Sequence, residues 1–146
     1  MATTFTDISL AASVRPIHRF PNPTWVENIA STRNGLLLVG ILGQAPAQLH
    51  ILDPFSHATQ DTLLHTFTPS NSIFGITEYE TDVFAVAAGN SSSTTANGTS
   101  DANISTLDLR RGTTKSSIKV RKLAHLPDAQ TNRRSVVQGH TGAVLF

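Results

Sequence analysis

Apolar residues in this chain come in short runs, and turn-forming residues close each run. The longest, Leu36–Leu42, is already interrupted by Gly40. Short runs, and the apolar and polar alternation of Trp25–Ala30, are typical of β-strands, and no stretch has the spacing of a long amphipathic helix. Asn34-Gly35 favours a type I′ hairpin turn, which needs two positive φ angles. We therefore expect an all-β fold.

Composition agrees with this prediction and excludes several functions. Charged residues make up only 14% of the chain, and Ser, Thr and Asn, which suit turns and strand surfaces, take their place. The net charge of +1 gives no electrostatic reason to expect nucleic acid, and the cations of Lys115–Arg134 have no aromatic residues between them. The absence of cysteine excludes disulfides, thiolate zinc sites and a cysteine nucleophile.

The chain has no recognisable targeting or membrane segment. Met1–Val14 lacks the basic start of a signal peptide, and Leu36–Leu42 is far too short to span a bilayer. We therefore expect a cytoplasmic protein without a membrane partner. Three glycosylation sequons, at Asn90, Asn97 and Asn103, are the one feature that favours secretion.

The expected strands form two similar sets. They are Val14–Phe20 as an edge strand, then Trp25–Ala30, Leu36–Leu42, Gln48–Leu52 and Thr62–Phe67, and then Ile73–Thr77, Val83–Ala88, Ile104–Leu109 and Val120–Ala124. Ile29 and Ile76, in the first strand of each set, are 47 positions apart, which is the period of four-stranded propeller blades.

This spacing predicts two four-stranded blades of an incomplete β-propeller. We expect an N-terminal extension (1–13), a partial propeller (14–128) with blade one at about 20–68 and blade two at about 72–126, and an irregular tail (129–146). Blades bury their faces against neighbouring blades. The chain is therefore expected either to form a homo-oligomer that completes the ring or to be a truncated relative of a longer protein.

Four segments resemble fungal propellers related to the SMP-30/gluconolactonase group, in their order and spacing. They are Phe20–Ala30, Asn34–Val39, Leu49–Pro54, and Phe74–Glu78 followed by Val83–Asn90. The resemblance covers about Val14–Asp128, roughly the first third of a full-length relative, so the chain looks like an N-terminal, truncated member. It implies a six-bladed propeller with a ligand site at the mouth of its central channel. Thr131–Arg134 depart from the family, in which an apolar strand with Asn-Gly opens the third blade.

The resemblance also implies a function in natural-product biosynthesis. Some of these fungal propellers are hetero-Diels–Alderases, which join a tropolone-derived quinone methide to a terpene alkene without a cofactor. Other members of the wider group are calcium- or zinc-dependent lactonases. We expect a cycloaddition catalyst acting on a small-molecule intermediate. The alternatives are a metal-dependent lactone hydrolase and a non-catalytic propeller remnant.

The candidate catalytic residues are Glu27 and Asn28, on the expected innermost strand. A carboxylate there is costly unless it is paired or binds a ligand. By resemblance, Glu27 is the nearest candidate for the metal-binding glutamate of a lactonase. A cycloaddition catalyst needs orientation and a few polar groups rather than a nucleophile, so Trp25 and Phe74 are candidate substrate-binding residues. Trp25 and Phe74 would equally suit an ordinary blade core.

Other polar residues indicate no further site. Glu78, Glu80 and Asp82 are expected to form a solvated turn. The histidines have no helical zinc spacing, and neither a Gly-x-Ser-x-Gly motif nor a glycine-rich phosphate loop occurs. The six histidines are His18, His50, His57, His65, His125 and His140.

Overall fold

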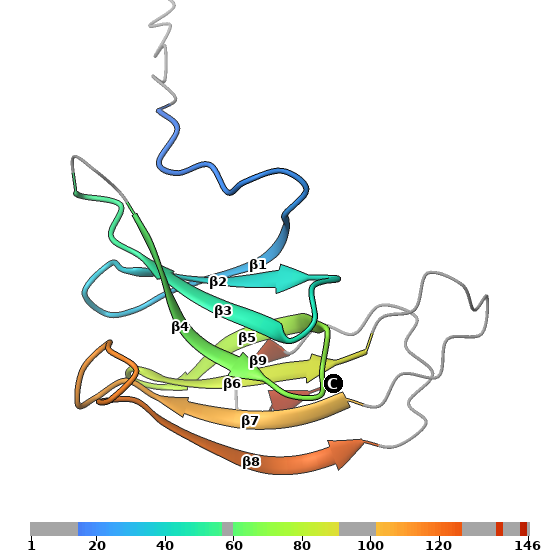
Figure 1. The fold of residues 1–146 in the computed structure, drawn as a ribbon. Coiled ribbons are helices and arrows are strands. Elements are labelled where there is room, and N and C mark those ends of the chain that lie inside the picture. The colour runs from blue at the N-terminus through green and yellow to red at the C-terminus, as the bar shows by residue number, and fades with distance from the viewer. Residues whose placement is uncertain (1–14, 57–59, 91–101, 127–136, 139–143, 146) are drawn as a thin grey trace, which may run out of the picture.

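A computed structural model describes residues 15–56, 60–90, 102–126, 137–138 and 144–145. The described chain is all-β, as expected, and contains two four-stranded antiparallel sheets (Figure 1). Sheet 1 consists, in order, of β1 (Trp25–Ser31), β2 (Leu37–Leu42), β3 (Ala47–Leu52) and β4 (Asp61–Phe67). Sheet 2 consists of β5 (Ser72–Glu80), β6 (Val83–Gly89), β7 (Ala102–Asp108) and β8 (Lys119–Leu126).

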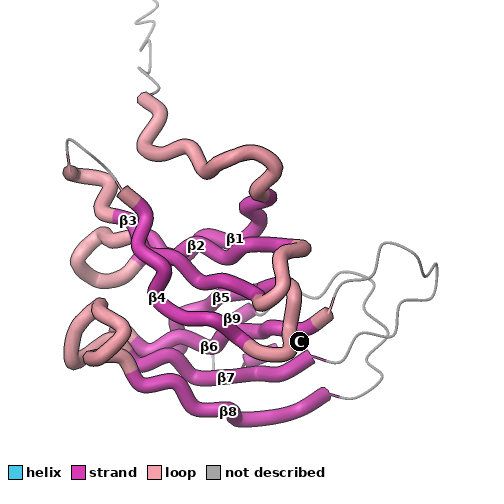
Figure 2. Tube along the Cα trace, in the orientation of Figure 1, coloured by secondary structure: helices cyan, strands magenta, loops and turns pink. Residues whose placement is uncertain are grey.

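The eight strands of the two sheets were all expected from the sequence, with shifts of a few residues at their ends. No helix is found among the described residues (Figure 2), and accordingly none with the length and hydropathy needed to span a membrane. β9 (Val137–Gln138) and β10 (Val144–Leu145) form a further antiparallel pair. The expected extension (1–13) and most of the tail (129–146) lie outside the described residues.

The prediction of an edge strand at Val14–Phe20 is wrong. Residues 15–22 form no regular strand, and Phe20 packs on the outer face of sheet 1, against Val39 and Ile41. Pro16 and Pro21 lack the backbone N–H that a ladder requires. The segment crosses the sheet face instead of extending the sheet.

The first hairpin turn differs from the predicted type I′ turn. Gly35 N–H donates to Thr32 O (2.9 Å), and Leu36 N–H donates to the Thr32 side-chain hydroxyl (3.1 Å). Gly35 has a φ of 79°, whereas Asn34 is not among the described non-glycine residues with positive φ. This geometry is a type I turn followed by a glycine bulge. Such a turn leaves the Leu36 N–H without a partner in the ladder, and the Thr32 hydroxyl accepts its hydrogen bond instead.

The irregularities of sheet 1 recur in sheet 2. A register shift at Glu27 in β1 is followed 47 positions later by one at Phe74 in β5. The shifts between β3 and β4 and between β7 and β8 likewise leave one extra residue each, Leu64 and Leu123. Because bulges are specific backbone features, their recurrence identifies the two sheets as structural repeats.

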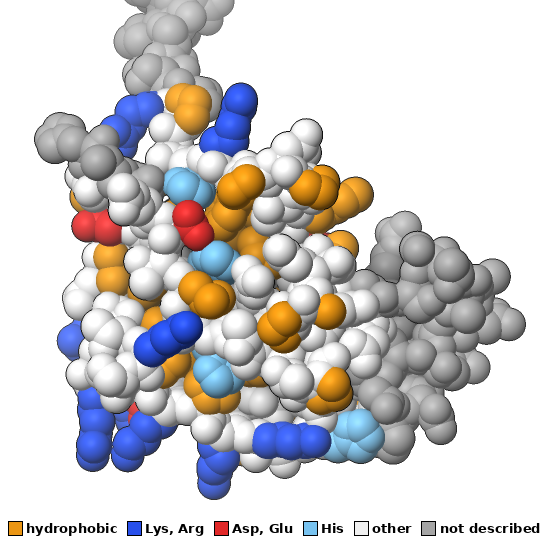
Figure 3. Space-filling view, viewed as in Figure 1, with side chains coloured by type: hydrophobic (Ala, Val, Ile, Leu, Met, Phe, Trp, Pro, Cys, Tyr) orange, Lys and Arg blue, Asp and Glu red, His pale blue; other side chains and the backbone are white. Residues whose placement is uncertain are grey.

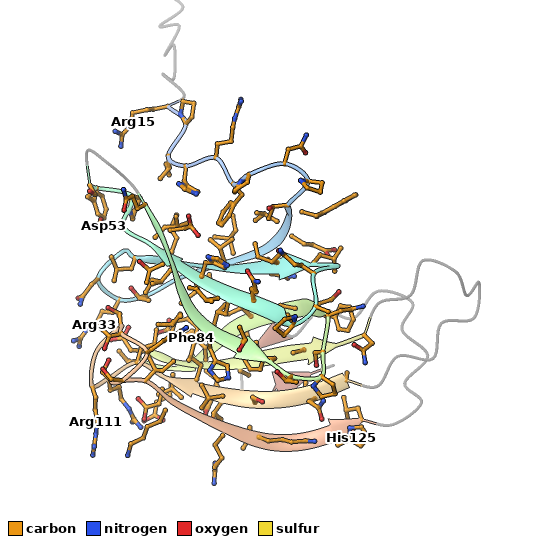
Figure 4. The ribbon with its side chains drawn as sticks, in the orientation of Figure 1. Arg15, Arg33, Asp53, Phe84, Arg111 and His125 are labelled. Carbon is orange, nitrogen blue, oxygen red and sulfur yellow. The ribbon has the colours of Figure 1, made fainter. Side chains whose placement is uncertain are left out.

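The two sheets pack through faces that are not equivalent. Leu38 of sheet 1 enters the shared core, but its counterpart 47 positions later, Ala85, belongs to a cluster on the opposite face of sheet 2. Val86 of sheet 2 enters the shared core, whereas its counterpart Val39 lies on the outer face of sheet 1. Figure 4 shows Phe84, which is fully buried, between the two sheets. The repeats are therefore stacked head to tail.

Close contacts fix the approach of the sheets at β5. A Cβ on Gly40 would lie 2.9 Å from Cγ2 of the buried Ile73, so a side chain there would push the sheets apart. The Asn28 side-chain amide donates to Ile73 O (2.8 Å). The connection from β4 to β5 is short. Its Ser70 carbonyl oxygen accepts a hydrogen bond from the N–H of Ala47, the first residue of β3 (2.7 Å). The last strand of sheet 1 therefore leads directly to the first strand of sheet 2.

Candidate functional site

β1 exposes a row of three side chains along its length, Trp25, Glu27 and Ile29, but the register shift at Glu27 places Trp25 and Ile29 on opposite faces of sheet 1. Trp25 is 66% exposed and Ile29 is 62% exposed, and Glu27 between them is also exposed. β1 is the first strand of its sheet and pairs only with β2 within that sheet. Exposure alternates along Trp25–Ala30 as predicted, but the prediction that Trp25, Glu27 and Ile29 share one face is wrong because of the bulge at Glu27. The prediction of Trp25 as a core residue is also wrong.

Glu27 and Asn28 are adjacent in β1, but they have different environments. Glu27 has no hydrogen bond or ion pair with any part of the chain that the structure describes, and its exposure removes the expected cost of burying a carboxylate. Asn28 is half-buried, and its amide is engaged by Ile73 O. Asn28 thus positions β1 against β5, whereas Glu27 is available to a ligand.

Phe74 does not join Trp25 in one cluster. It is half-buried and packs against Ala85, Ala87 and Ile104 on the outer face of sheet 2. The structure therefore brings Asn28 close to the residue preceding Phe74, but it places Phe74 in the apolar cluster of sheet 2 rather than in the exposed row of β1.

The residues near Glu27 do not form a calcium or zinc site. Within the described ranges no group of three His, Asp or Glu side chains is arranged to hold a metal ion. Calcium requires six or more oxygen ligands, and the polar neighbour of Glu27 in sequence, Asn28, is hydrogen-bonded to the backbone of β5.

Two histidines share one carboxylate on the outer face of sheet 1, which the sequence analysis missed. His50 Nδ1 lies 2.6 Å from Asp61 Oδ2, and its Nε2 lies 3.0 Å from Gln48 Oε1. His18 Nε2 lies 3.2 Å from Asp61 Oδ1, and the Phe20 ring packs edge-on against both imidazoles. These contacts hold residues 15–20 against β3 and β4. The only sequence signal was the alternation that places Gln48 and His50 on one face.

The acidic turn is exposed at Glu80, as expected, and it also forms ionic contacts with both sheets that were not expected. Asp82 Oδ1 accepts a hydrogen bond from Arg33 N–H (3.0 Å), which joins the first hairpins of the two sheets. Glu80 pairs with Arg110 (3.0 Å), and Arg110 also pairs with Asp108 (2.8 Å). Hydrogen bonds from the side chain and backbone of Arg110 lower the pKa of Asp108 to about 2.

The remaining charged and glycosylation signals are placed by the sheets. Lys119, Arg121 and Lys122 of β8 are exposed, and Figure 3 shows Lys and Arg side chains gathered on the β8 side of the molecule. Asn90 is exposed, Asn97 lies outside the described residues, and Asn103 lies in β7 with its side chain 3.1 Å from His125 Nδ1. A strand residue with this contact is a poor glycosylation site.

Comparison with known proteins adds no assignment to this geometry. A scan for known protein families finds no match to the chain, and a search of curated proteins finds none either.

Proposed function

We propose that sheets 1 and 2 are neighbouring blades of a β-propeller. Three observations support this proposal: each sheet is a four-stranded meander, the last strand of one leads into the first strand of the next, and the sheets stack head to tail. Head-to-tail contacts generate a ring when their rotation closes, whereas a pseudo-twofold sandwich would pair equivalent faces.

The function that this arrangement favours is binding of an apolar small-molecule intermediate along the edge of β1, where Trp25, Glu27 and Ile29 are exposed. The observation that carries it is the exposure of Trp25 and Ile29 on either side of Glu27. In a propeller the first strand of each blade borders the central channel, which is where ligands bind. Large exposed apolar side chains beside one polar group are typical of ligand sites.

The proposed reaction, which follows from the resemblance to fungal propellers, is a hetero-Diels–Alder cycloaddition of a quinone methide with a terpene alkene. Trp25 and Ile29 flank the edge of β1 from opposite faces of sheet 1, and would contact apolar partners held together at this edge, since holding the partners in contact is the main requirement of such a reaction. A carboxylate can only accept hydrogen bonds, so Glu27 would orient a hydroxyl of the tropolone ring. Asn28 would act indirectly, by fixing β1 to β5.

Trp25 is the only tryptophan of the chain, so its fluorescence reports directly on this site. Titration with a sesquiterpene alkene is expected to give a saturable change in Trp25 emission. Ile29→Asp should abolish the change, because it places a charge beside the ligand. Leu123→Asp is the matched control, since Leu123 is an exposed apolar residue of β8 at 49%. An equal loss in both variants would overturn the proposed site.

Catalysis is tested separately, with a quinone methide generated in the presence of the alkene. The protein should raise the rate of adduct formation above background and alter the ratio of stereoisomers, and Glu27→Gln should reduce both effects. Binding without any rate increase would support the non-catalytic alternative. Lactone hydrolysis that requires added calcium or zinc would support the hydrolase instead.

We further propose that copies of this chain complete the ring. Six blades would need three two-blade copies, and sedimentation velocity should then show a discrete trimer. In such a ring, sheet 1 of one copy meets sheet 2 of the next, so residues 15–20 would have to leave the outer face of sheet 1. A monomer at all concentrations would exclude assembly of this chain alone.

A further inference from the structure

A second candidate site lies between the sheets, at the end where the hairpin turns meet. A cavity of about 430 Å³ opens between β3 and β4 of sheet 1 and the connection from β7 to β8 of sheet 2. Its floor is apolar, from Leu36 and Ile51, which belong to the core between the sheets. Its rim is polar, from Asp53, Gln60, Thr62, Thr113, Thr114 and Lys115. Trp25, Glu27 and Ile29, the residues of the site proposed on β1, do not line this cavity.

The β7–β8 connection has a defined shape that places its residues at the rim. The Ser117 hydroxyl donates to Thr114 O (3.0 Å) and accepts from Thr114 N–H (3.0 Å). Gly112 has a φ of 134°, and a Cβ there would lie 2.8 Å from Ser117 Oγ. Ile118 N–H also donates to Thr114 O (3.1 Å). A preorganised loop reduces the conformational entropy that a ligand must overcome.

Lys115 is the cation of this rim. It forms no hydrogen bond or ion pair within the described part of the chain. Its charge nevertheless acts on sheet 1. The pKa of His65 in β4 is lowered mainly by burial and, to a smaller extent, by the Lys115 ammonium. The acidic group of the rim, Asp53, has Oδ1 engaged by Phe55 N–H (2.9 Å).

We propose that this cavity binds a small amphiphilic anion, with its apolar chain against Leu36 and Ile51 and its anionic group beside Lys115. A ligand with both parts matches an apolar floor with one cation at the rim. An ammonium beside a carboxylate also provides a charge-assisted hydrogen bond, which is stronger than a neutral one. Asp53 disfavours more than one negative charge, so the ligand class is a monoanion.

Calorimetry with octanoate tests the proposal. Octanoate should bind in a saturable manner and octylammonium should not, because both carry the same chain but opposite charge. Lys115→Gln should weaken octanoate about tenfold while changing 1-octanol by less than about twofold. Lys119→Gln, which changes an exposed lysine that does not line the cavity, should leave octanoate binding unchanged. Equal binding of octanoate and octylammonium, or equal effects of the two lysine variants, would overturn the proposal.

Two further measurements locate the ligand. In an NMR titration of the imidazole of His65, saturating octanoate should raise its pKa, because the bound anion offsets the charge of Lys115. Thr62→Trp, which puts a large side chain at an exposed rim position, should block octanoate and 1-octanol alike. An unchanged His65 pKa, or full binding by a folded Thr62→Trp variant, would place the ligand elsewhere and refute the site.

Discussion

The two sheets have the same backbone but differ in what they leave exposed. Their bulges recur, and Gly35 in the first turn and Asp82 in the second, 47 positions apart, both have positive φ. Yet Trp25 is 66% exposed, whereas its counterpart Ser72 is fully buried. A second similarity lies at the end of the third strand of each sheet. There, Asp53 in sheet 1 and Asp108 in sheet 2 each accept a hydrogen bond from the backbone N–H two residues later.

The difference follows from position in the stack. β5 lies against β1, β2 and β3, so positions that are exposed in β1 become packing positions in β5. The same backbone can therefore bear a ligand-facing row in one repeat and an interface in the next. Local sequence determines the strand, whereas the neighbouring sheet determines what the strand is used for.

The largest expected effect is a difference in unfolding free energy between a variant in the core, Phe84→Ala, and a variant in the exposed row of β1, Trp25→Ala. Phe84→Ala should lower the free energy of unfolding by about 3–5 kcal/mol, because it leaves a cavity between the sheets. Trp25→Ala should change it by only about 0.5 kcal/mol, because the side chain is mostly exposed. Guanidinium denaturation of both variants measures the contrast. A comparable loss from Trp25→Ala would mean that the β1 face is covered.

The second prediction concerns Gly40 and its counterpart Ala87. Gly40→Ala should destabilise the protein by about 1–3 kcal/mol, because its Cβ would lie 2.9 Å from Cγ2 of Ile73. Ala87→Gly should cost only about 1 kcal/mol, from backbone entropy. Denaturation midpoints test this order. The reverse order would show that sheet 2, and not sheet 1, sets the closest approach.

The third prediction concerns the junction of the two hairpins. Asp82→Ala should cost about 1–2 kcal/mol, because alanine at a φ of 55° is strained and the hydrogen bond from Arg33 is lost. Asp82→Gly should cost less, because glycine removes the backbone strain, as it does at Gly35. Thermal unfolding ranks the variants. If Asp82→Gly equals Asp82→Ala, strain has no part in the effect.

The smallest effect is a pH dependence that should belong to sheet 2. The pKa of Asp108 is lowered from 3.8 to about 2, so its contribution to stability is present above about pH 4 and is lost as the pH falls through about 2. Asp108→Asn should remove this part of the acid sensitivity. Stability curves from neutral pH to about pH 2 provide the measurement, with Arg110→Met as a second variant that should raise the pKa of Asp108. An unchanged acid profile in both variants would exclude this ion pair.

Strand positions were predictable from the sequence because each strand is a short apolar run closed by turn residues. The repeat was predictable for the same reason, through the 47-residue spacing of Ile29 and Ile76. What failed were features that depend on distant partners. Val14–Phe20 has the composition of a strand, but Pro16 within it and Pro21 after it direct it across a sheet face.

The histidine cluster shows why contacts were harder to predict than strands. Asp61 meets His50 because β3 and β4 pair with His50 opposite Leu63 and Leu52 opposite Asp61, which puts the two side chains on one face. The register of a strand pair decides which side chains share a face, and no local pattern in either strand marks it. The exposure of Trp25 was equally hidden, because it depends on which faces the second sheet covers.

Head-to-tail stacking gives the molecule a polarity, since the two ends of the stack are different and mutually complementary. Any pair of such repeats is therefore also one step of a growing filament, unless an end is blocked. Phe20 on Val39 and Ile41, secured by His18 on Asp61, blocks the sheet 1 end. Residues 15–20 thus act as a terminal cap, and assembly of the ring proposed above would require this cap to be released.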